Sequence, residues 1–197
     1  MTLRILLIDT DSERAEALEK KLADAGFSEV SRVTSGPDLS AEVERLAPDL
    51  IIVDMALPDR DALEDIRSLS AGTPRPIVMF SDKDDPAIVD EAIAAGVCSY
   101  NLSGIASQEV KPIVASAIAL FRRFRHVETE LAVAKALLEE RRLIERAKAI
   151  LMRDRKMMEP EAYRWLQKKA MNENRKLAQV VAEFVKKEET DARRAGS

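Results

Sequence analysis

The chain has few of the side chains that catalytic and metal sites usually require. Its 197 residues include one cysteine, Cys98, and one histidine, His126. A single cysteine cannot form an internal disulfide and is ordinarily a small core residue. One histidine among several arginines leaves no nucleophile–base pair and no metal site built from histidine and cysteine. The sequence therefore predicts a binding protein rather than an enzyme.

Long apolar runs are also missing. No stretch approaches the roughly 18 apolar residues that a membrane span requires, and the first apolar run stops at Asp9, too early for a signal peptide. We therefore expect a cytoplasmic protein with no membrane partner. Aromatic residues make up 4% of the chain and hydrophobic residues 46%, so the core is predicted to be aliphatic.

Each half of the chain is poor in charge of one sign. Residues 1–121 contain 11 Lys and Arg against 22 Asp and Glu, whereas residues 122–197 contain 20 against 13. A basic half joined to an acidic half favours a polyanionic partner for the basic one. Long helices can also carry excess cations on a solvated face, so charge alone leaves both interpretations open.

The acidic half alternates between short apolar runs and amphipathic segments. The predicted strands cover residues 3–8, 30–33, 50–53, 76–80 and 97–102. Helices are predicted between them and from Gln108 onward. Continuous apolar strands that alternate with amphipathic helices are typical of an α/β fold, here a five-stranded doubly wound parallel sheet covered on both faces.

Polar side chains follow the predicted strands at the edge where such sheets form their sites. They are Asp9, Asp11, Asp54 and Ser81. Carboxylates that gather in one place repel one another unless they share a cation, and Mg²⁺ prefers oxygen ligands. A Mg²⁺ ion held by Asp9, Asp11 and Asp54 is thus a candidate cofactor, although none is required. The alternative, a helix cap, is stronger for Asp11 than for Asp54.

Residues 1–122 resemble the receiver domain of response regulators. The resemblance rests on the segment Ile-Ile-Val-Asp-Met-Ala-Leu-Pro, which contains Asp54, and on the residues that end the other strands. It implies that Asp54 is the phospho-acceptor and that Asp9 is the first acid of the pocket. It also implies that Ser81 is the switch hydroxyl and Tyr100 the switch aromatic residue.

Two positions depart from the receiver pattern. Thr10 stands where a second acid is expected, with Asp11 beside it, and Ser103 stands where the family has a lysine. A phosphoryl group adds about two negative charges, which this pocket would compensate less well without that lysine. We therefore favour a receiver that docks a partner, such as a sensor protein that sequesters it, over a switch phosphorylated by a sensor kinase.

Apolar residues in steps of four and three connect the two halves. They are Leu120, Phe124, Val127, Leu131, Ala134 and Leu138. This heptad seam, with no glycine or proline between Pro112 and Pro160, predicts a long helix with a coiled-coil section over residues 123–142. We expect the seam to form a parallel homodimer; the alternative is packing within one chain.

Three short helices are predicted over residues 143–188, the second opened by Pro160 and the third covering Leu177 to Val185. We expect a disordered tail over residues 189–197. Cations outside the small core, together with Tyr163 and Trp165, suit RNA, which proteins hold through phosphates and stacked bases. Both aromatic rings could instead pack in the core.

Residues 143–188 resemble the ANTAR domain, the RNA-binding module of the AmiR and NasR antitermination regulators. The resemblance rests on Glu145-Arg146-Ala147-Lys148, Leu151-Met152, Glu161-Ala162-Tyr163, Leu166 and Ala170-Met171. The RNA-binding candidates are Arg146, Ala147, Lys148, Met152, Tyr163, Lys168 and Lys169. The family usually has a glycine near Lys156, and its loss is expected to affect the first loop between helices.

The resemblances imply an RNA-binding transcription antiterminator. A basic dimer would stabilise paired hairpins in a leader transcript, so that a terminator hairpin that shares their nucleotides could not form. Regulators of nitrate and nitrite assimilation are the expected relatives. The alternative is a two-component regulator that binds DNA, which is less favoured because the predicted third helix carries cations only near its ends.

Overall fold

The computed structural model describes residues 3–34, 39–72 and 74–195, with side chains described as far as Thr190. It divides into two compact units, Met1–His126 and Val127–Ser197, called here the N-terminal and C-terminal units. Within the described residues, no helix combines the length and the continuous apolarity that crossing a bilayer requires.

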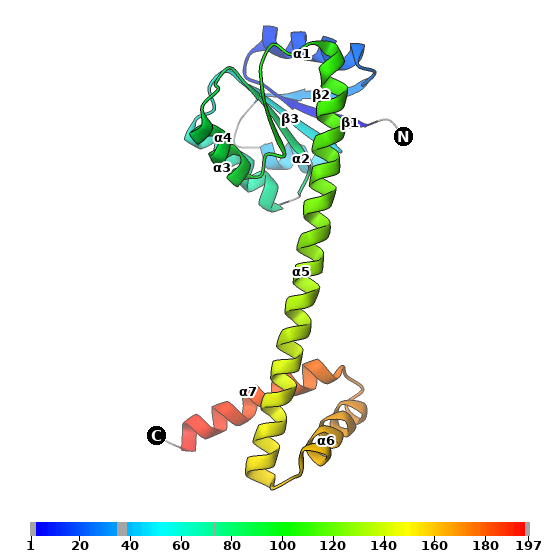
Figure 1. Ribbon diagram of the computed structural model, residues 1–197, viewed down its shortest axis with the longest axis vertical. Helices are drawn as coiled ribbons and strands as arrows, with labels where there is room; N and C mark the ends of the chain where they lie inside the picture. Colours follow the sequence, from blue (N-terminus) through cyan, green and yellow to red (C-terminus); the bar gives the residue numbers. More distant parts are fainter. Residues whose placement is uncertain (1–2, 35–38, 73, 196–197) are drawn as a thin grey trace. The chain divides into compact units, whose positions relative to one another are not determined.

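The N-terminal unit is built on one five-stranded parallel sheet (Figure 1). Its strands are β1 (Arg4–Ile8), β2 (Glu29–Val33), β3 (Leu50–Met55), β4 (Ile77–Ser81) and β5 (Ser99–Leu102). Their order is β2-β1-β3-β4-β5, and every pair is parallel. The predicted doubly wound sheet is thereby confirmed, because the order reverses beside β1 as helices pass from one face to the other.

Helices cover both faces of this sheet. Apolar side chains of α2 (Leu39–Leu46), α3 (Arg60–Gly72) and α4 (Pro86–Ala95) pack on one face. Those of α1 (Ser12–Asp24) and of the first turns of α5 (Ser107–Arg155) pack on the other. Successive strand residues point to opposite faces, so strands buried on both sides must be apolar throughout, as the predicted strands are.

The C-terminal unit is a small three-helix structure. The end of α5 packs with α6 (Glu159–Asn172) and α7 (Leu177–Ala195) around a core that includes Ala147, Leu151, Leu166 and Val181. The turn into α6 is held by the Glu161 carboxylate, which accepts a hydrogen bond from the backbone N–H of Met158 at 2.9 Å. The predicted long helix is present as α5, which continues unbroken from Ser107 to Arg155.

The expected disordered tail is wrong over most of its length. The third helix was expected to end at Val185, yet α7 continues to Ala195, and only residues 196 and 197 of that tail lie outside the described part. One contact with α5 and one bond within α7 involve residues of this extension. The Glu189 carboxylate pairs with Arg146 at 2.6 Å, and the Thr190 hydroxyl donates to the Lys186 carbonyl at 2.8 Å.

Candidate functional site

Three polar side chains predicted to meet at the carboxyl edge of the sheet are buried there. Asp9 directly follows β1, Asp54 lies near the end of β3, and Ser81 ends β4. These strands are neighbours in the sheet, and the exposed fractions of the three residues are 0%, 4% and 0%. Buried carboxylates require a compensating charge, so this pocket needs a cation close to them.

That compensating charge comes from Arg14, a residue that the sequence pattern did not reveal. Its Nε donates to Asp9 Oδ2 at 3.0 Å, and its Nη2 bonds the other oxygen of the same carboxylate. The same Nε lies 3.4 Å from Asp54 Oδ1, and Nη2 donates to the Asp54 carbonyl at 3.2 Å. One guanidinium in the first turn of α1 therefore joins two carboxylates at the carboxyl ends of adjacent strands.

Asp11 has a different role from the other two acids. It is exposed, and its Oδ1 accepts the backbone N–H groups of Glu13 at 2.9 Å and Arg14 at 3.1 Å. It therefore caps α1, and these bonds lower the pKa of its carboxyl. Within the described ranges, no three His, Cys, Asp or Glu side chains are arranged to hold a metal ion. The expected metal site of Asp9, Asp11 and Asp54 stays a prediction, with the Asp11 carboxylate engaged as the cap of α1.

Burial dominates the protonation of Asp54. Removal from water raises the pKa of this carboxyl to about 6, against the opposing attraction of the Arg14 guanidinium. Asp9 and Asp82 raise it further, while the Ser103 hydroxyl lowers it. Ser103, noted in the sequence only as the place of a missing lysine, thus faces the candidate acceptor with a neutral group.

The candidate switch residues, Ser81 and Tyr100, both contact the segment that follows β4. The Ser81 hydroxyl accepts the backbone N–H of Lys83 at 3.2 Å. The Tyr100 hydroxyl donates to the carbonyl of Lys83 at 2.8 Å. Ser81 in β4 and Tyr100 in β5 therefore both bond the backbone of Lys83. These bonds connect the pocket to the surface near α4.

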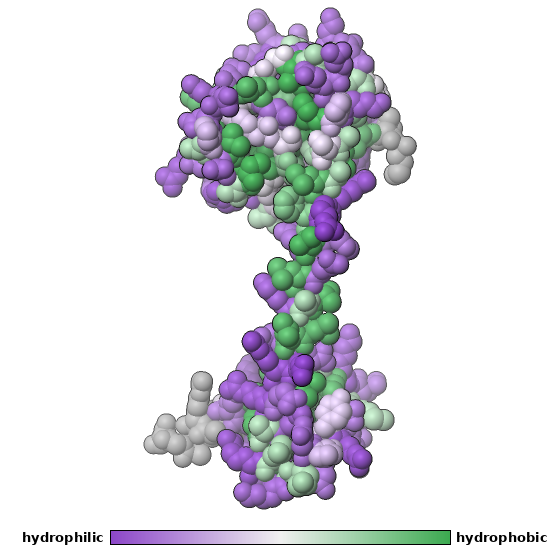
Figure 2. Space-filling view, viewed as in Figure 1, coloured by the Kyte–Doolittle hydropathy of each residue, from purple (hydrophilic) through white to green (hydrophobic). Residues whose placement is uncertain are grey.

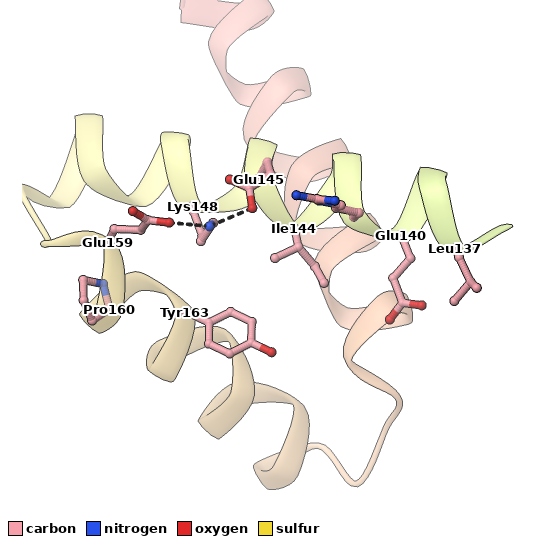
Figure 3. Close-up of a pocket in the computed structure, with 9 residues that line it drawn as sticks. Leu137, Glu140, Ile144, Glu145, Lys148, Glu159, Pro160 and Tyr163 are labelled. Atoms are coloured by element: carbon pink, nitrogen blue, oxygen red, sulfur yellow. Dashed lines mark hydrogen bonds and ion pairs between the residues drawn. The ribbon is translucent and has the colours of Figure 1, made fainter. Parts of the chain in front are cut away.

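In the C-terminal unit, Lys148 is not the exposed cation that we expected. It is 8% exposed, and its Nζ lies 2.8 Å from a Glu145 oxygen and 2.7 Å from a Glu159 oxygen (Figure 3). Glu145 precedes it by one turn of α5, and Glu159 opens α6. Lys148 therefore joins two helices, and these two carboxylates, not singled out from the sequence, raise its pKa.

The other RNA-binding candidates divide between core and surface. Ala147 is fully buried in the three-helix core, so its assignment as an RNA contact is corrected to a packing role. Met152 and Tyr163 are 41% and 38% exposed. Arg146 and Lys168 are also exposed. Lys169 is half-buried and pairs with Glu173 at 2.6 Å.

The two aromatic residues of α6 face different surroundings. Trp165 packs against the core, with its ring 5.5 Å from that of Phe184 and with the Arg155 guanidinium 4.5 Å over it. Tyr163 instead lines an open groove of about 680 Å³ between α5 and α6 (Figure 3). Leu137, Ile144 and Pro160 form its apolar wall. Of the two rings, Tyr163 is therefore the one placed to stack on a ligand.

The C-terminal unit also carries exposed cations that do not line this groove. They are Arg146, Arg153, Arg155, Lys156, Arg164 and Lys168. The groove itself carries the carboxylates of Glu140, Glu145 and Glu159 against two cations. The charge of the groove suits a base better than a phosphate, whereas the exposed cations outside it suit phosphates.

An exposed apolar stripe runs along the middle of α5, where Figure 2 shows green side chains. Phe124 and Leu131, two members of the heptad seam, are 59% and 52% exposed, and Val127 and Leu138 are exposed as well. Exposed apolar surface of this kind commonly marks an interaction site.

Models of two protein families match the chain. The response regulator receiver domain matches residues 5–110, and the ANTAR domain matches residues 132–185. The transcriptional regulatory protein PdtaR of Mycobacterium tuberculosis is 28% identical over 183 residues, which cover 91% of this chain and 89% of PdtaR. The DNA-binding response regulator MtrA of the same species is 32% identical over 62% of this chain and 52% of MtrA.

Solved structures show the same fold for the N-terminal unit. A pilus assembly-related protein of Burkholderia pseudomallei has a TM-score of 0.55 at 21% identity, covering 60% of this chain and 91% of that one. The chemotaxis protein CheY4 of Vibrio cholerae has a TM-score of 0.53 at 19% identity, covering 59% and 99%. At these identities the likeness concerns the fold alone.

Proposed function

Because the chain belongs to the response regulators that join a receiver domain to a C-terminal ANTAR domain, we propose that it binds paired hairpins in leader transcripts and stabilises them. ANTAR domains bind RNA, and regulators of this family are not enzymes. The observation that carries the proposal is the set of exposed cations in the C-terminal unit, together with the exposed Tyr163 ring in its groove.

The physical step is linkage between binding and RNA folding. Whatever binds one fold of a transcript and not its competitor raises the population of the bound fold. A protein that holds two hairpins thus lowers the population of a terminator hairpin that shares their nucleotides. This step requires affinity and no bond making, in keeping with a surface of cations and one exposed ring.

The RNA is proposed to meet two kinds of side chain. Arg146 and Lys168 are exposed and suit phosphates, while Tyr163 suits a base splayed from a loop. Lys148, held by Glu145 and Glu159, is placed to keep α5 and α6 in register beside that groove. We assign Lys148 a positioning role in RNA binding and keep Met152 and Lys169 as candidate RNA contacts.

We propose that the receiver domain receives the regulatory signal. Receiver domains pair with sensor kinases, and a sensor protein that sequesters this chain is the partner we favour. The neutral Ser103 in place of a lysine and the Arg14 ion pairs both support docking over phosphorylation of Asp54. Control of nitrate and nitrite assimilation genes is proposed from the family resemblance alone.

The test compares binding of a two-hairpin leader RNA by the full chain and by the double variant Arg146→Ala/Lys168→Ala. Removing one cation that neutralises a phosphate should reduce the slope of log affinity against log salt by roughly 0.7 to 0.9, so we expect a lower slope and weaker binding. Arg67→Ala, which removes an exposed cation of the receiver domain, serves as the matched control and should leave both quantities unchanged.

A second pair of variants separates stacking from charge. Tyr163→Ala should weaken binding by roughly 1–3 kcal/mol, the usual contribution of one stacked base, whereas Tyr163→Phe should retain most of the affinity. RNA affinity and salt slope equal to those of the parent in the double variant and in Tyr163→Ala would refute the proposal. Tighter binding to duplex DNA than to the RNA would favour the DNA-binding alternative.

A further inference from the structure

The acidic pocket of this receiver domain does not fit the Mg²⁺ ion that its family uses. Both Asp9 oxygens are engaged: Oδ2 by Arg14 Nε at 3.0 Å, and Oδ1 by Arg14 Nη2 and by the backbone N–H of Asp11 at 2.8 Å. Thr10 stands in place of a second acid, and the Asp11 carboxylate caps α1. Within the described part of the pocket, no direct ligand set remains for a divalent ion unless Arg14 leaves.

We propose that the Arg14 guanidinium is the resident cation of this pocket and that it excludes Mg²⁺ from Asp9 and Asp54. A guanidinium remains charged at every physiological pH, and its planar fork matches a carboxylate. It lies within ion-pair distance of both acids. A divalent cation at the same carboxylates would lie within a few ångströms of this fixed positive charge, where repulsion is strong in a site removed from water.

The position of Arg14 is built into the fold. Its backbone N–H is bonded by the cap of α1, which fixes where the side chain leaves the helix. Its side chain is 23% exposed, whereas those of Asp9 and Asp54 are 0% and 6% exposed. The guanidinium is therefore the partner that solvent reaches in both ion pairs, while the two carboxylates are nearly closed to it.

This inference goes beyond the proposed RNA binding, because it concerns which cation occupies the acidic pocket of the receiver domain. With its cation supplied by the chain, the pocket has the same charge at every Mg²⁺ concentration. Removing Arg14 should expose two neighbouring carboxylates that then favour a shared cation. The proposal thus predicts that a single substitution creates a metal site, and this outcome is independent of RNA.

Mn²⁺ is a suitable probe because its paramagnetism broadens NMR signals near the site. The full-length parent chain and Arg14→Ser are titrated with Mn²⁺ while the backbone amide signals of Asp9, Asp11, Asp54 and Ser81 are followed. We expect Arg14→Ser to reach half-broadening at a Mn²⁺ concentration at least about tenfold below that of the parent, since a cation has been removed beside the carboxylates.

Arg4→Ser is the matched control, because it removes an equal charge from the same unit where Arg4 pairs with Asp49. It should behave as the parent does, which separates a local site from a general change in charge. Arg14→Gln, which retains more of the side chain, replaces Arg14→Ser if that variant loses its dispersed amide spectrum.

Equal half-broadening concentrations in the parent and in the folded Arg14 variant would overturn the proposal. So would the absence of site-specific broadening in both, since the carboxylates would then take no cation with or without Arg14. Mg²⁺ competition that restores the broadened signals of the variant would support it further. If the parent chain does not bind RNA, each of these outcomes of the Mn²⁺ titrations can still be interpreted.

Discussion

At the scale of single residues, burial and ion pairing act on Asp54 in opposite directions. The residue is 4% exposed, and the pKa of its carboxyl lies at about 6 because burial outweighs the attraction of Arg14. An ordinary aspartate has a pKa of 3.8. Folding thus favours the protonated form, so the contribution of Asp54 to stability falls as pH rises from 3.8 to about 6 and stays at its lowest value above that.

Asp54→Asn should therefore stabilise the receiver domain in a pH-dependent way. Relative to the parent, the free energy of unfolding of the variant should rise by roughly 2 kcal/mol between pH 4 and pH 8. The gain develops as pH rises from about 4 to about 6, where the unfolded chain has lost the proton that Asp54 keeps in the folded state, and it is complete above the folded pKa of about 6. Urea titrations followed through the NMR signals of β1 and β3 measure it at each pH.

Asp49→Asn provides a control of opposite sign. The hydrogen bonds from Arg4 lower the pKa of Asp49, so this ionised carboxylate favours folding, and the favourable effect fades as pH falls. The variant should be less stable than the parent at neutral pH and approach it under acid conditions. A stability difference for Asp54→Asn that stays constant from pH 4 to pH 8 would contradict the assignment of burial as the dominant cause.

The contrast between Asp54 and Arg14 shows how far single residues can be predicted from sequence. Asp9, Asp54 and Ser81 were found because they end buried strands, a pattern that alternation of elements makes visible. Arg14 gives no such signal, because its position relies on the direction in which the first turn of α1 leaves β1. The burial of Lys148 was likewise missed, since Glu159 belongs to another helix.

At the scale of elements, the turn between α5 and α6 contains a strained residue. Lys156 directly follows α5 and has a φ of 55°, a left-handed conformation that costs a side-chain-bearing residue roughly 1–2 kcal/mol. The ANTAR family usually has a glycine near this position. The loop therefore retains the conformation that a glycine would adopt, and the backbone of Lys156 bears the strain.

Lys156→Gly should stabilise the C-terminal unit, because relief of this strain exceeds the extra freedom that glycine has in the unfolded chain. We expect a gain of up to about 1 kcal/mol. Trp165 is the only tryptophan, so urea unfolding followed by its fluorescence reports on this unit alone. Arg153→Gly, inside α5, also removes a cation and should instead destabilise by about 1 kcal/mol. Equal destabilisation by Lys156→Gly and Arg153→Gly would show that the backbone conformation of Lys156 does not lower the stability of the unit.

Element boundaries could be predicted where a local signal exists. Gly26 and Gly96, both with positive φ, follow α1 and α4, and Pro160 lies in the first turn of α6. The end of α7 had no such signal. Its last turns are charged and look like a tail in sequence, while Glu189 reaches Arg146 across the unit. The end of α7 is therefore supported by a contact between residues distant in sequence, which local composition does not reveal.

At the scale of the whole molecule, the exposed seam of α5 is the surface that we expect to contact a second chain. Phe124, Val127, Leu131 and Leu138 are all exposed along one stripe, and such a stripe buries well against a copy of itself. A parallel dimer would place two ANTAR domains on one RNA. The second hairpin would then bind at the high effective concentration that the first creates.

Leu131→Lys should therefore separate the chains and weaken RNA binding selectively. Sedimentation should show a dimer for the parent and a monomer for this variant, because a charge in the seam must be buried without a partner. Affinity for a single hairpin should be unchanged, whereas affinity for a two-hairpin RNA should fall by about 10²-fold or more as avidity disappears. Ala136→Lys adds the same charge on the opposite side of α5 and should remain dimeric. A parent chain that sediments as a monomer, or a Leu131→Lys variant that retains full affinity for the two-hairpin RNA, would show that the two hairpins are held without pairing of this seam.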